Sequence, residues 1–151
     1  MVFAVIGGDA RLAYLRPMLL DDGHATREFA LRNAEDIPGS FRVGSVKEVA
    51  AEVDCVILPL PLVGSDGSLN TPLDDAAVAL KDVWSSVKPG TLICGGYISE
   101  IDMELARSFG HEPQDYYKRE EVIVSNAVAT AEGACRSFCR KRPLRFGSHG
   151  C

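Results

Sequence analysis

A glycine turn with two charged side chains is the first feature of the sequence that could do chemistry. Positions 7–11 read GGDAR and directly follow the apolar run at positions 2–6. Tight glycine turns next to a helix start expose backbone N–H groups, which suit phosphate or carboxylate ligands. Arg11 adds a guanidinium that can bind a carboxylate through two hydrogen bonds. We therefore predict an anion-binding turn made by Gly7, Gly8, Asp9 and Arg11, although glycines also occur after strands simply to turn the chain.

Two more loops of unusual composition follow apolar runs. The first spans positions 59–72 and is rich in glycine and serine, with Ser65 near its middle. The second is the glycine pair at positions 95–96, followed by Tyr97. Ligands of open parallel sheets bind beyond the carboxyl ends of the strands. We therefore expect these loops to lie near the GGDAR turn, and we include Ser65 among the candidate ligand-binding residues.

The standard nucleotide fingerprints are missing. After Ile6 the chain reads GGDAR, where a dinucleotide-binding fold would show G-x-G-x-x-G, and no G-x-x-x-x-G-K-[ST] occurs. We therefore predict no cofactor-binding residues in this chain. An unrelated α/β nucleotide-binding domain stays as an alternative.

No metal site is predicted either. The C-terminal segment holds four side chains of metal-binding type, but their spacings match no zinc module: Cys135, Cys139, His149 and Cys151. We expect His24 and His111 to lie on the surface.

These loops need a scaffold, which the hydrophobic pattern indicates. Short unbroken apolar runs alternate about five times with stretches of helical periodicity, a pattern typical of buried parallel strands and crossover helices. The fold class is therefore α/β, with a doubly wound, mostly parallel sheet flanked by helices, Rossmann-like or flavodoxin-like, in a single domain. Strands are predicted at 2–6, 25–30, 55–58, 91–94 and 121–124, and helices at 11–20, 45–51, 76–87, 99–109 and from 126.

Local signals refine these helices. Ser45 and Ser99 are predicted N-caps, and Asp74 or Asp75 is predicted to cap the helix at 76–87. Pro17 lies inside the first helix and is expected to kink or split it. Trp84 and Phe109 fall on helix faces, where we expect them in the core, and Cys55 and Cys94 are expected to be small core residues.

Composition places limits on function. The chain has 151 residues, 46% of them hydrophobic, and a formal net charge of −5, which argues against nucleic acid as a partner. Five of the 16 basic residues fall in the last sixteen positions, which hold no Asp or Glu. We therefore divide the chain into a domain at 1–134 and a basic, cysteine-containing tail at 135–151.

No membrane association is expected. The longest apolar runs are far shorter than the roughly 20 residues that span a bilayer. The N-terminus has no basic residue before its apolar stretch, so a signal peptide is not predicted. The expected location is the cytoplasm.

Three stretches, in this order, resemble the N-terminal domain of the dipicolinate synthase A subunit. They are AVIGGDAR at 4–11, ILP at 57–59 with the loop that follows to 73, and KREEVIVSN at 118–126 leading to TAEG at 130–133. The first and third are fairly specific, since neither is a generic turn or loop sequence of α/β proteins. The resemblance covers roughly the first 134 residues.

The resemblance implies an oxidoreductase of spore-forming bacteria. It implies oxidation of dihydrodipicolinate, or of its hydrated precursor, to aromatic dipicolinic acid in the mother-cell cytoplasm. It further implies the flavoprotein-like B subunit of dipicolinate synthase as the protein partner. NADP is the implied electron acceptor, bound by a second domain that carries the glycine-rich loop.

The implied substrate fits the anion-binding turn. Dipicolinate and its precursor bear two carboxylates, one of which the turn and Arg11 could bind. Asn126 and Thr130 share a face near the start of the last predicted helix and are further substrate-binding candidates. Aromatisation needs a base, for which Asp9 is the candidate.

The chain departs from the family after Ala134, where a basic, cysteine-rich composition replaces an expected apolar helix. We interpret the tail as a frameshift product or a cloning truncation, with a natural short paralogue as the alternative. The short chain is then expected to be inactive alone, and a non-catalytic module that docks on the partner, the B subunit, is the second hypothesis. Loss of a terminal helix would also expose apolar surface and favour a homo-oligomer.

Overall fold

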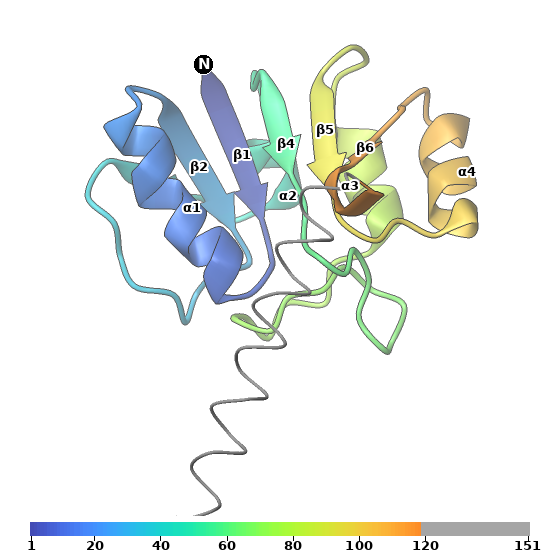
Figure 1. Cartoon of the computed structure of the whole chain (residues 1–151), viewed down its shortest axis with the longest axis horizontal. Helices are drawn as coiled ribbons and strands as arrows, with labels where there is room; N and C mark the ends of the chain where they lie inside the picture. The colour runs from blue at the N-terminus through green and yellow to red at the C-terminus, as the bar shows by residue number, and fades with distance from the viewer. Residues whose placement is uncertain (119–151) are drawn as a thin grey trace, which may run out of the picture. The chain divides into compact units, whose positions relative to one another are not determined.

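Six parallel strands form the centre of the part of the chain that the computed structural model describes, residues 1–118 (Figure 1). The order across the sheet is β3 (Ser40–Arg42), β2 (Ala25–Phe29), β1 (Val2–Ile6), β4 (Cys55–Ile57), β5 (Leu92–Gly95) and β6 (Gln114–Asp115). All five neighbouring pairs are parallel. The order 3-2-1-4-5-6 is that of a doubly wound Rossmann-type sheet, so the predicted fold class is confirmed.

The strand order reverses between β1 and β4. The chain first builds outward from β1 to β3, then returns to place β4 on the other side of β1. At such a reversal the loops that leave the two strands diverge to opposite sides, and the place between them, at the carboxyl ends of β1 and β4, is the expected ligand crevice of an open sheet. Open α/β sheets bind their ligands at such a switch point.

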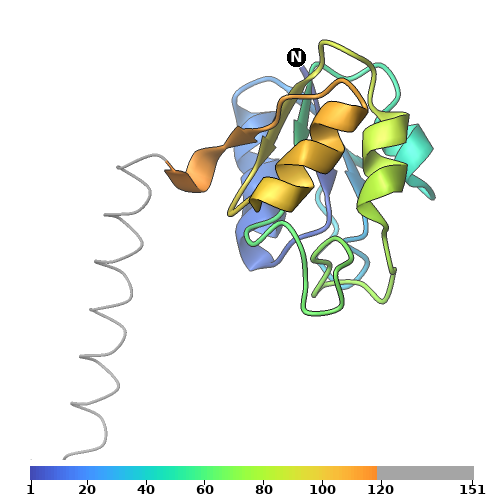
Figure 2. The same cartoon turned by 90° about the vertical axis from the view of Figure 1, so that its right-hand side faces the viewer.

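Helices cover both faces of the sheet (Figures 1 and 2). On one face lies α1 (Ala10–Asp21), whose leucines pack on Val5 and Ile57. On the other lie α2 (Val46–Val49), α3 (Leu80–Ser86) and α4 (Glu100–Ser108), packed on Ala4, Ile6 and Val56. The central strands are apolar throughout because they are buried on both faces. Trp84 on α3 is 1% exposed, as predicted for the core.

The predicted serine caps are confirmed. Ser45 Oγ accepts a hydrogen bond from the Glu48 N–H at 3.2 Å, and Ser99 Oγ accepts one from the Asp102 N–H at 3.2 Å. Glu48 reaches back to the Gly44 N–H at 3.0 Å, so the capping box is reciprocal.

The predicted aspartate cap of α3 is wrong. That helix begins at Leu80, after Ala79, and its N-cap makes no side-chain hydrogen bond. Asp74 instead accepts from the N–H groups of Arg32 and Ala76 at 3.0 and 3.1 Å. Its carboxylate thus joins the loop after β2 to the loop before α3.

Pro17 does not split α1, which is one helix from Ala10 to Asp21. Proline lacks the N–H that would donate to the carbonyl four residues earlier, here that of Ala13. Arg16 Nε donates to this carbonyl at 3.1 Å and replaces the missing bond.

Two burial assignments are also wrong. His111, expected on the surface, is only 3% exposed and its Nε2 lies 2.8 Å from the Trp84 carbonyl oxygen, whereas Phe109, expected in the core, is 36% exposed. The short edge strands β3 and β6 are absent from the sequence prediction, because neither has an apolar run. The strand predicted at 121–124 and the helix from 126 lie outside the described residues.

Candidate functional site

The GGDAR turn lies at the switch point, directly after β1. Gly7 and Gly8 have φ of +66° and +93°, a region that glycine adopts readily. Gly7 N–H donates to the Phe29 carbonyl at 2.8 Å, and Gly8 N–H donates to the Asn70 carbonyl at 2.9 Å. Both donors are therefore engaged within the chain, where they fix the turn between β2 and the loop after β4. A ligand at this turn would therefore meet the charged side chains of Asp9 and Arg11, at the start of α1.

Arg11 bridges the two sides of the switch point. Asp9 caps α1 by accepting from the Arg11 N–H at 2.9 Å, and its carboxylate also accepts from Arg11 Nε and Nη2 at 3.0 and 2.8 Å. Nη2 donates further to the Leu60 carbonyl at 2.6 Å, on the loop that follows β4. The guanidinium is thus fixed across the crevice, yet the Arg11 side chain is 57% exposed. Its Nη1 has no acceptor among residues 1–118.

The ion pair sets the protonation of Asp9. Hydrogen bonds from the Arg11 guanidinium hold the pKa of this carboxyl below its ordinary value, against the opposing effect of partial burial. Asp9 is therefore ionised at neutral pH and is a weak base in this arrangement. The geometry suits it better to holding Arg11 than to removing a proton.

Tyr116 closes the crevice on the side of β5. It begins the 3-10 turn η1 (Tyr116–Lys118), and its hydroxyl donates to the Leu58 carbonyl at 3.2 Å. Burial raises the pKa of Tyr116 to about 12, so the phenol stays neutral at physiological pH. Gly96 makes this packing feasible, since a Cβ there would lie 2.7 Å from Leu60 Cβ and 2.8 Å from Tyr116 Cε2.

Tyr97 has a strained backbone beside this crevice. Its φ is +54°, in the left-handed region that bulky side chains avoid, and the residue is 65% exposed. Such a conformation costs about 1–3 kcal/mol and concentrates at functional sites. The Asp115 carboxylate holds it, by accepting from the N–H groups of Tyr97, Ile98 and Tyr117 at 3.0, 3.1 and 3.0 Å.

Two thiols lie on the α1 face of β4 and β5. Cys55 is buried, as predicted, and Cys94 is half-buried. A hydrogen bond from the Cys55 thiol lowers the pKa of Cys94 to about 7, against the effect of burial.

The structure brings together some of the predicted residues and separates others. Gly7, Gly8, Asp9 and Arg11 form one turn at the switch point. Ser65 is exposed on the loop closed by the Val63–Leu69 bridge, and within the described residues no hydrogen bond joins it to that turn. Asn126 and Thr130 lie outside the described residues.

Sequence reasoning does not find Tyr97, Asp115 and Tyr116 as a group. Tyr116 and Tyr117 belong to a charged run of the sequence, which is typical of a solvated surface. The glycine pair at 95–96 is the available signal, because a glycine there admits a close neighbour. Nothing in the sequence indicates that the neighbour comes from twenty positions further along.

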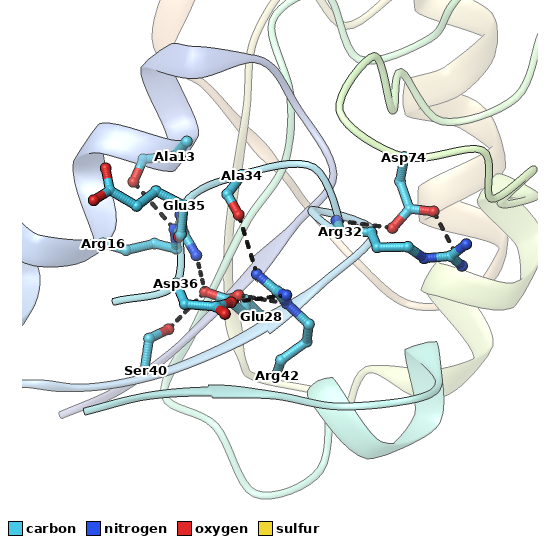
Figure 3. Close-up of polar contacts among 10 residues, drawn as sticks. All are labelled: Ala13, Arg16, Glu28, Arg32, Ala34, Glu35, Asp36, Ser40, Arg42 and Asp74. Atoms are coloured by element: carbon cyan, nitrogen blue, oxygen red, sulfur yellow. Dashed lines mark hydrogen bonds and ion pairs between the residues drawn. The ribbon is translucent and has the colours of Figure 1, made fainter. Parts of the chain in front are cut away.

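A buried ion network lies on the α1 side of the sheet and joins α1, β2 and β3 (Figure 3). Glu28 on β2 is 2% exposed and accepts from Arg16, from Ser40 Oγ at 2.7 Å and from Arg42 Nε at 2.9 Å. In dinucleotide-binding folds, an acidic residue after the second strand binds the ribose hydroxyl. Glu28 comes one residue before the end of β2, and its carboxylate is occupied by the chain itself.

Hollows elsewhere on the surface hold none of the predicted site residues. One of about 420 Å³ lies between the loop at Asp66–Ser68 and helices α3 and α4, and one of about 380 Å³ lies over the amino ends of β1 and β2. The crevice is preferred because it combines a fixed guanidinium, a strained aromatic residue and the switch point. Among residues 1–118, no three metal-binding side chains cluster, and no helix is long and apolar enough to cross a membrane.

Together, the sheet order and the charged turn define a Rossmann-type α/β domain with a candidate ligand site at the switch point between β1 and β4. A family model that describes the N-terminal domain of the dipicolinate synthase A subunit matches residues 2–116. The chain belongs to this family. The resemblance found in the sequence is therefore confirmed, which decides against an unrelated α/β domain.

Two solved structures are similar. The dipicolinate synthase A chain from Bacillus subtilis aligns with a TM-score of 0.78 at 19% identity, over 95% of this chain and 49% of that chain. The dipicolinate synthase A subunit from Bacillus halodurans aligns with a TM-score of 0.77 at 16% identity, over the same shares of the two chains. At these identities the likeness supports the fold alone, and the present chain spans about half the length of either relative. No curated protein sequence matches the chain.

Proposed function

We propose that the chain is the substrate-side domain of a dipicolinate synthase A subunit, whose reaction oxidises dihydrodipicolinate or its hydrated precursor to dipicolinic acid. The observation that carries this proposal is Arg11, a half-exposed guanidinium fixed by Asp9 and by the Leu60 carbonyl across the switch point of a family member. A fixed guanidinium binds a carboxylate with defined geometry. The substrate and the product each carry two carboxylates.

The proposed roles divide between this domain and the rest of the enzyme. Arg11 binds one carboxylate, and Asp9 holds the guanidinium in place. Asp9 remains the candidate base, although its lowered pKa favours the positioning role. NADP accepts the hydride and is bound by a second domain, and the flavoprotein-like B subunit is the protein partner. The reaction takes place in the mother-cell cytoplasm of a spore former.

Substitution of Arg11 tests the proposal. Calorimetric titration with dipicolinate, the stable aromatic product, should show binding to the unaltered chain. Arg11→Ala should weaken it about tenfold or more, because a hydrogen-bonded ion pair with a charged ligand contributes about 1.5–3 kcal/mol. The melting temperature should change little, since the side chain is half exposed.

Arg107→Ala is the matched control. Arg107 is 54% exposed and pairs with Glu112 at 3.3 Å, but it lies near the end of α4, at the opposite edge of the sheet. Its loss should leave dipicolinate affinity unchanged. Equal affinity of the Arg11→Ala and unaltered chains would overturn the proposal.

A further inference from the structure

Neither burial nor the backbone conformation requires a tyrosine at the strained turn after β5. Tyr97 adopts a φ of +54°, where glycine or asparagine would fit with less strain. The backbone conformation is held by the Asp115 carboxylate through N–H groups, which any residue except proline supplies. The ring itself is 65% exposed, so burial does not explain it.

The ring has a defined orientation. Tyr97 and Tyr117 meet edge to face, with ring centroids 5.9 Å apart and planes at 80°. Asp115 Oδ1 accepts from the N–H groups of both tyrosines at 3.0 Å, so one carboxylate fixes both backbones. The contact with Tyr117 orients the Tyr97 ring, and the residue stays 65% exposed, so another flat group can contact it. Aromatic rings favour offset stacking with such groups.

The ring lies at the same edge of the sheet as the guanidinium of Arg11. Arg11 Nη2 donates to the Leu60 carbonyl, and the Leu60 side chain packs directly over Gly96, the residue before Tyr97. Tyr116 packs over the same glycine, and the charge of Arg11 acts on its hydroxyl. The Arg11 guanidinium thus contacts Leu60, and Leu60 in turn packs on Gly96, the neighbour of Tyr97.

We propose that Tyr97 determines specificity by stacking on the planar ring of a heteroaromatic dicarboxylate whose carboxylate is bound by Arg11. This inference rests on the proposed function and assigns the residue that distinguishes a flat ring from a puckered one. Asp115 is the positioning residue, since it holds the turn and orients the ring.

Two dicarboxylates that place their carboxylates alike on a flat aromatic ring and on a puckered saturated ring test the proposal. Isophthalate and cis-cyclohexane-1,3-dicarboxylate carry the same two carboxylates on a planar and a puckered six-membered ring. The unaltered chain should bind isophthalate about two- to tenfold more tightly in calorimetric titrations, which is the range expected of one stacked ring. Tyr97→Phe should keep this preference, and Tyr97→Asn should abolish it without lowering the melting temperature. Tyr97→Gly gives a second test of the lost ring, because glycine adopts positive φ freely.

The outcomes separate this inference from the function on which it rests. Equal affinity of the unaltered chain for the two ligands, or a preference that survives in Tyr97→Asn and Tyr97→Gly, overturns the role of Tyr97 while Arg11 keeps its own. No binding of dipicolinate or of either analogue to the unaltered chain overturns the proposed function, and this inference with it.

Discussion

Glu28 accepts hydrogen bonds from side chains of two other elements, α1 and β3. Arg16 comes from α1, Ser40 and Arg42 from β3, and Arg16 Nη2 also donates to the Glu35 carbonyl at 2.9 Å (Figure 3). The network therefore joins α1 to the outer edge of the sheet. The network explains how the Arg16–Glu28 ion pair can remain buried, since the two opposite charges contact each other and are further hydrogen-bonded.

Loss of the Glu28 charge should strongly destabilise the protein. Glu28→Gln leaves the buried Arg16 without its counter-ion, which typically costs about 3–5 kcal/mol in the free energy of unfolding. Urea unfolding monitored by the fluorescence of Trp84 measures this change. Glu112→Gln is the control, since it removes an exposed partner of Arg107 and should cost less than about 1 kcal/mol. Similar midpoints for the two variants would contradict the structural role.

Glu28 also makes the stability of the protein depend on pH. Burial would raise the pKa of Glu28, but the hydrogen bonds from Arg16, Ser40 and Arg42 outweigh it and hold the pKa below its ordinary value. A lowered folded-state pKa contributes stability above the unfolded-state pKa, and this stability is lost as pH falls through the folded-state value. The difference between the unaltered chain and Glu28→Gln should therefore be constant from pH 7 to about 5 and shrink in more acidic urea titrations. A difference that grows on acidification would contradict the direction of this shift.

At the scale of elements, the glycine turn after β1 fixes where α1 begins. A Cβ on Gly8 would lie 2.4 Å from Leu12 Cδ1 and 2.9 Å from Leu12 Cγ, so the turn and the first turn of α1 are in contact. Gly90, before β5, has a similar φ of +85° but no neighbour within 4 Å of the position of its Cβ. Both positions thus need a residue that tolerates positive φ, but only Gly8 also needs the absence of a side chain.

Alanine at Gly8 should therefore destabilise the protein more than alanine at Gly90. Both substitutions incur the strain of positive φ, about 1 kcal/mol or more, and only Gly8→Ala adds a clash with Leu12. Thermal unfolding of the two variants checks the difference. Because Gly8 precedes Asp9, the same variant should also weaken dipicolinate binding, whereas Gly90→Ala should not. Equal melting temperatures would show that Leu12 moves aside freely.

Elements with an unbroken apolar run or a serine cap could be predicted from the sequence. The strands β1, β4 and β5 and the starts of α2 and α4 depend on such local patterns, and they agree with the structure to within a residue or two. The strand β3, with only Phe41 apolar, and the two-residue β6 could not, since their pairing depends on neighbours distant in sequence. The start of α3 was misplaced because Asp74 has a tertiary partner in Arg32.

Some residues of the candidate site could likewise be predicted from the sequence, and others could not. Arg11 and Asp9 were predictable, because residue types and spacing within one turn define their chemistry. The loops that carry Leu60 and Gly96 were expected near this turn, and the Arg11–Leu60 hydrogen bond agrees with that for the first of them. The individual contacts of Leu60, Gly96 and Asp115 were not predictable, because each is made across the carboxyl edge of the sheet. Gly7 and Gly8 were expected to offer free N–H donors, yet the structure gives those donors to Phe29 and Asn70.

At the scale of the whole molecule, a Rossmann-type strand order without the dinucleotide fingerprint predicts that this chain binds the carboxylate substrate and not the cofactor. The order 3-2-1-4-5-6 is that of dinucleotide-binding domains. Three features of such a site are nevertheless altered: the turn reads GGDAR, its glycine N–H groups are engaged, and the acidic residue of β2 is buried in an ion network. A pyrophosphate would also meet the Asp9 carboxylate at the start of α1.

Titration of the full chain with NADP and with dipicolinate tests this division. We expect binding of dipicolinate that Arg11→Ala weakens, and no saturable heat with NADP at concentrations up to about 1 mM, the weak end of ordinary cofactor affinities. Micromolar NADP affinity would assign the cofactor to this domain, and the crevice between β1 and β4 would then be a nucleotide site. Absence of NADP binding together with Arg11-dependent dipicolinate binding would support hydride transfer by a second domain. The present domain would then bind and orient the substrate.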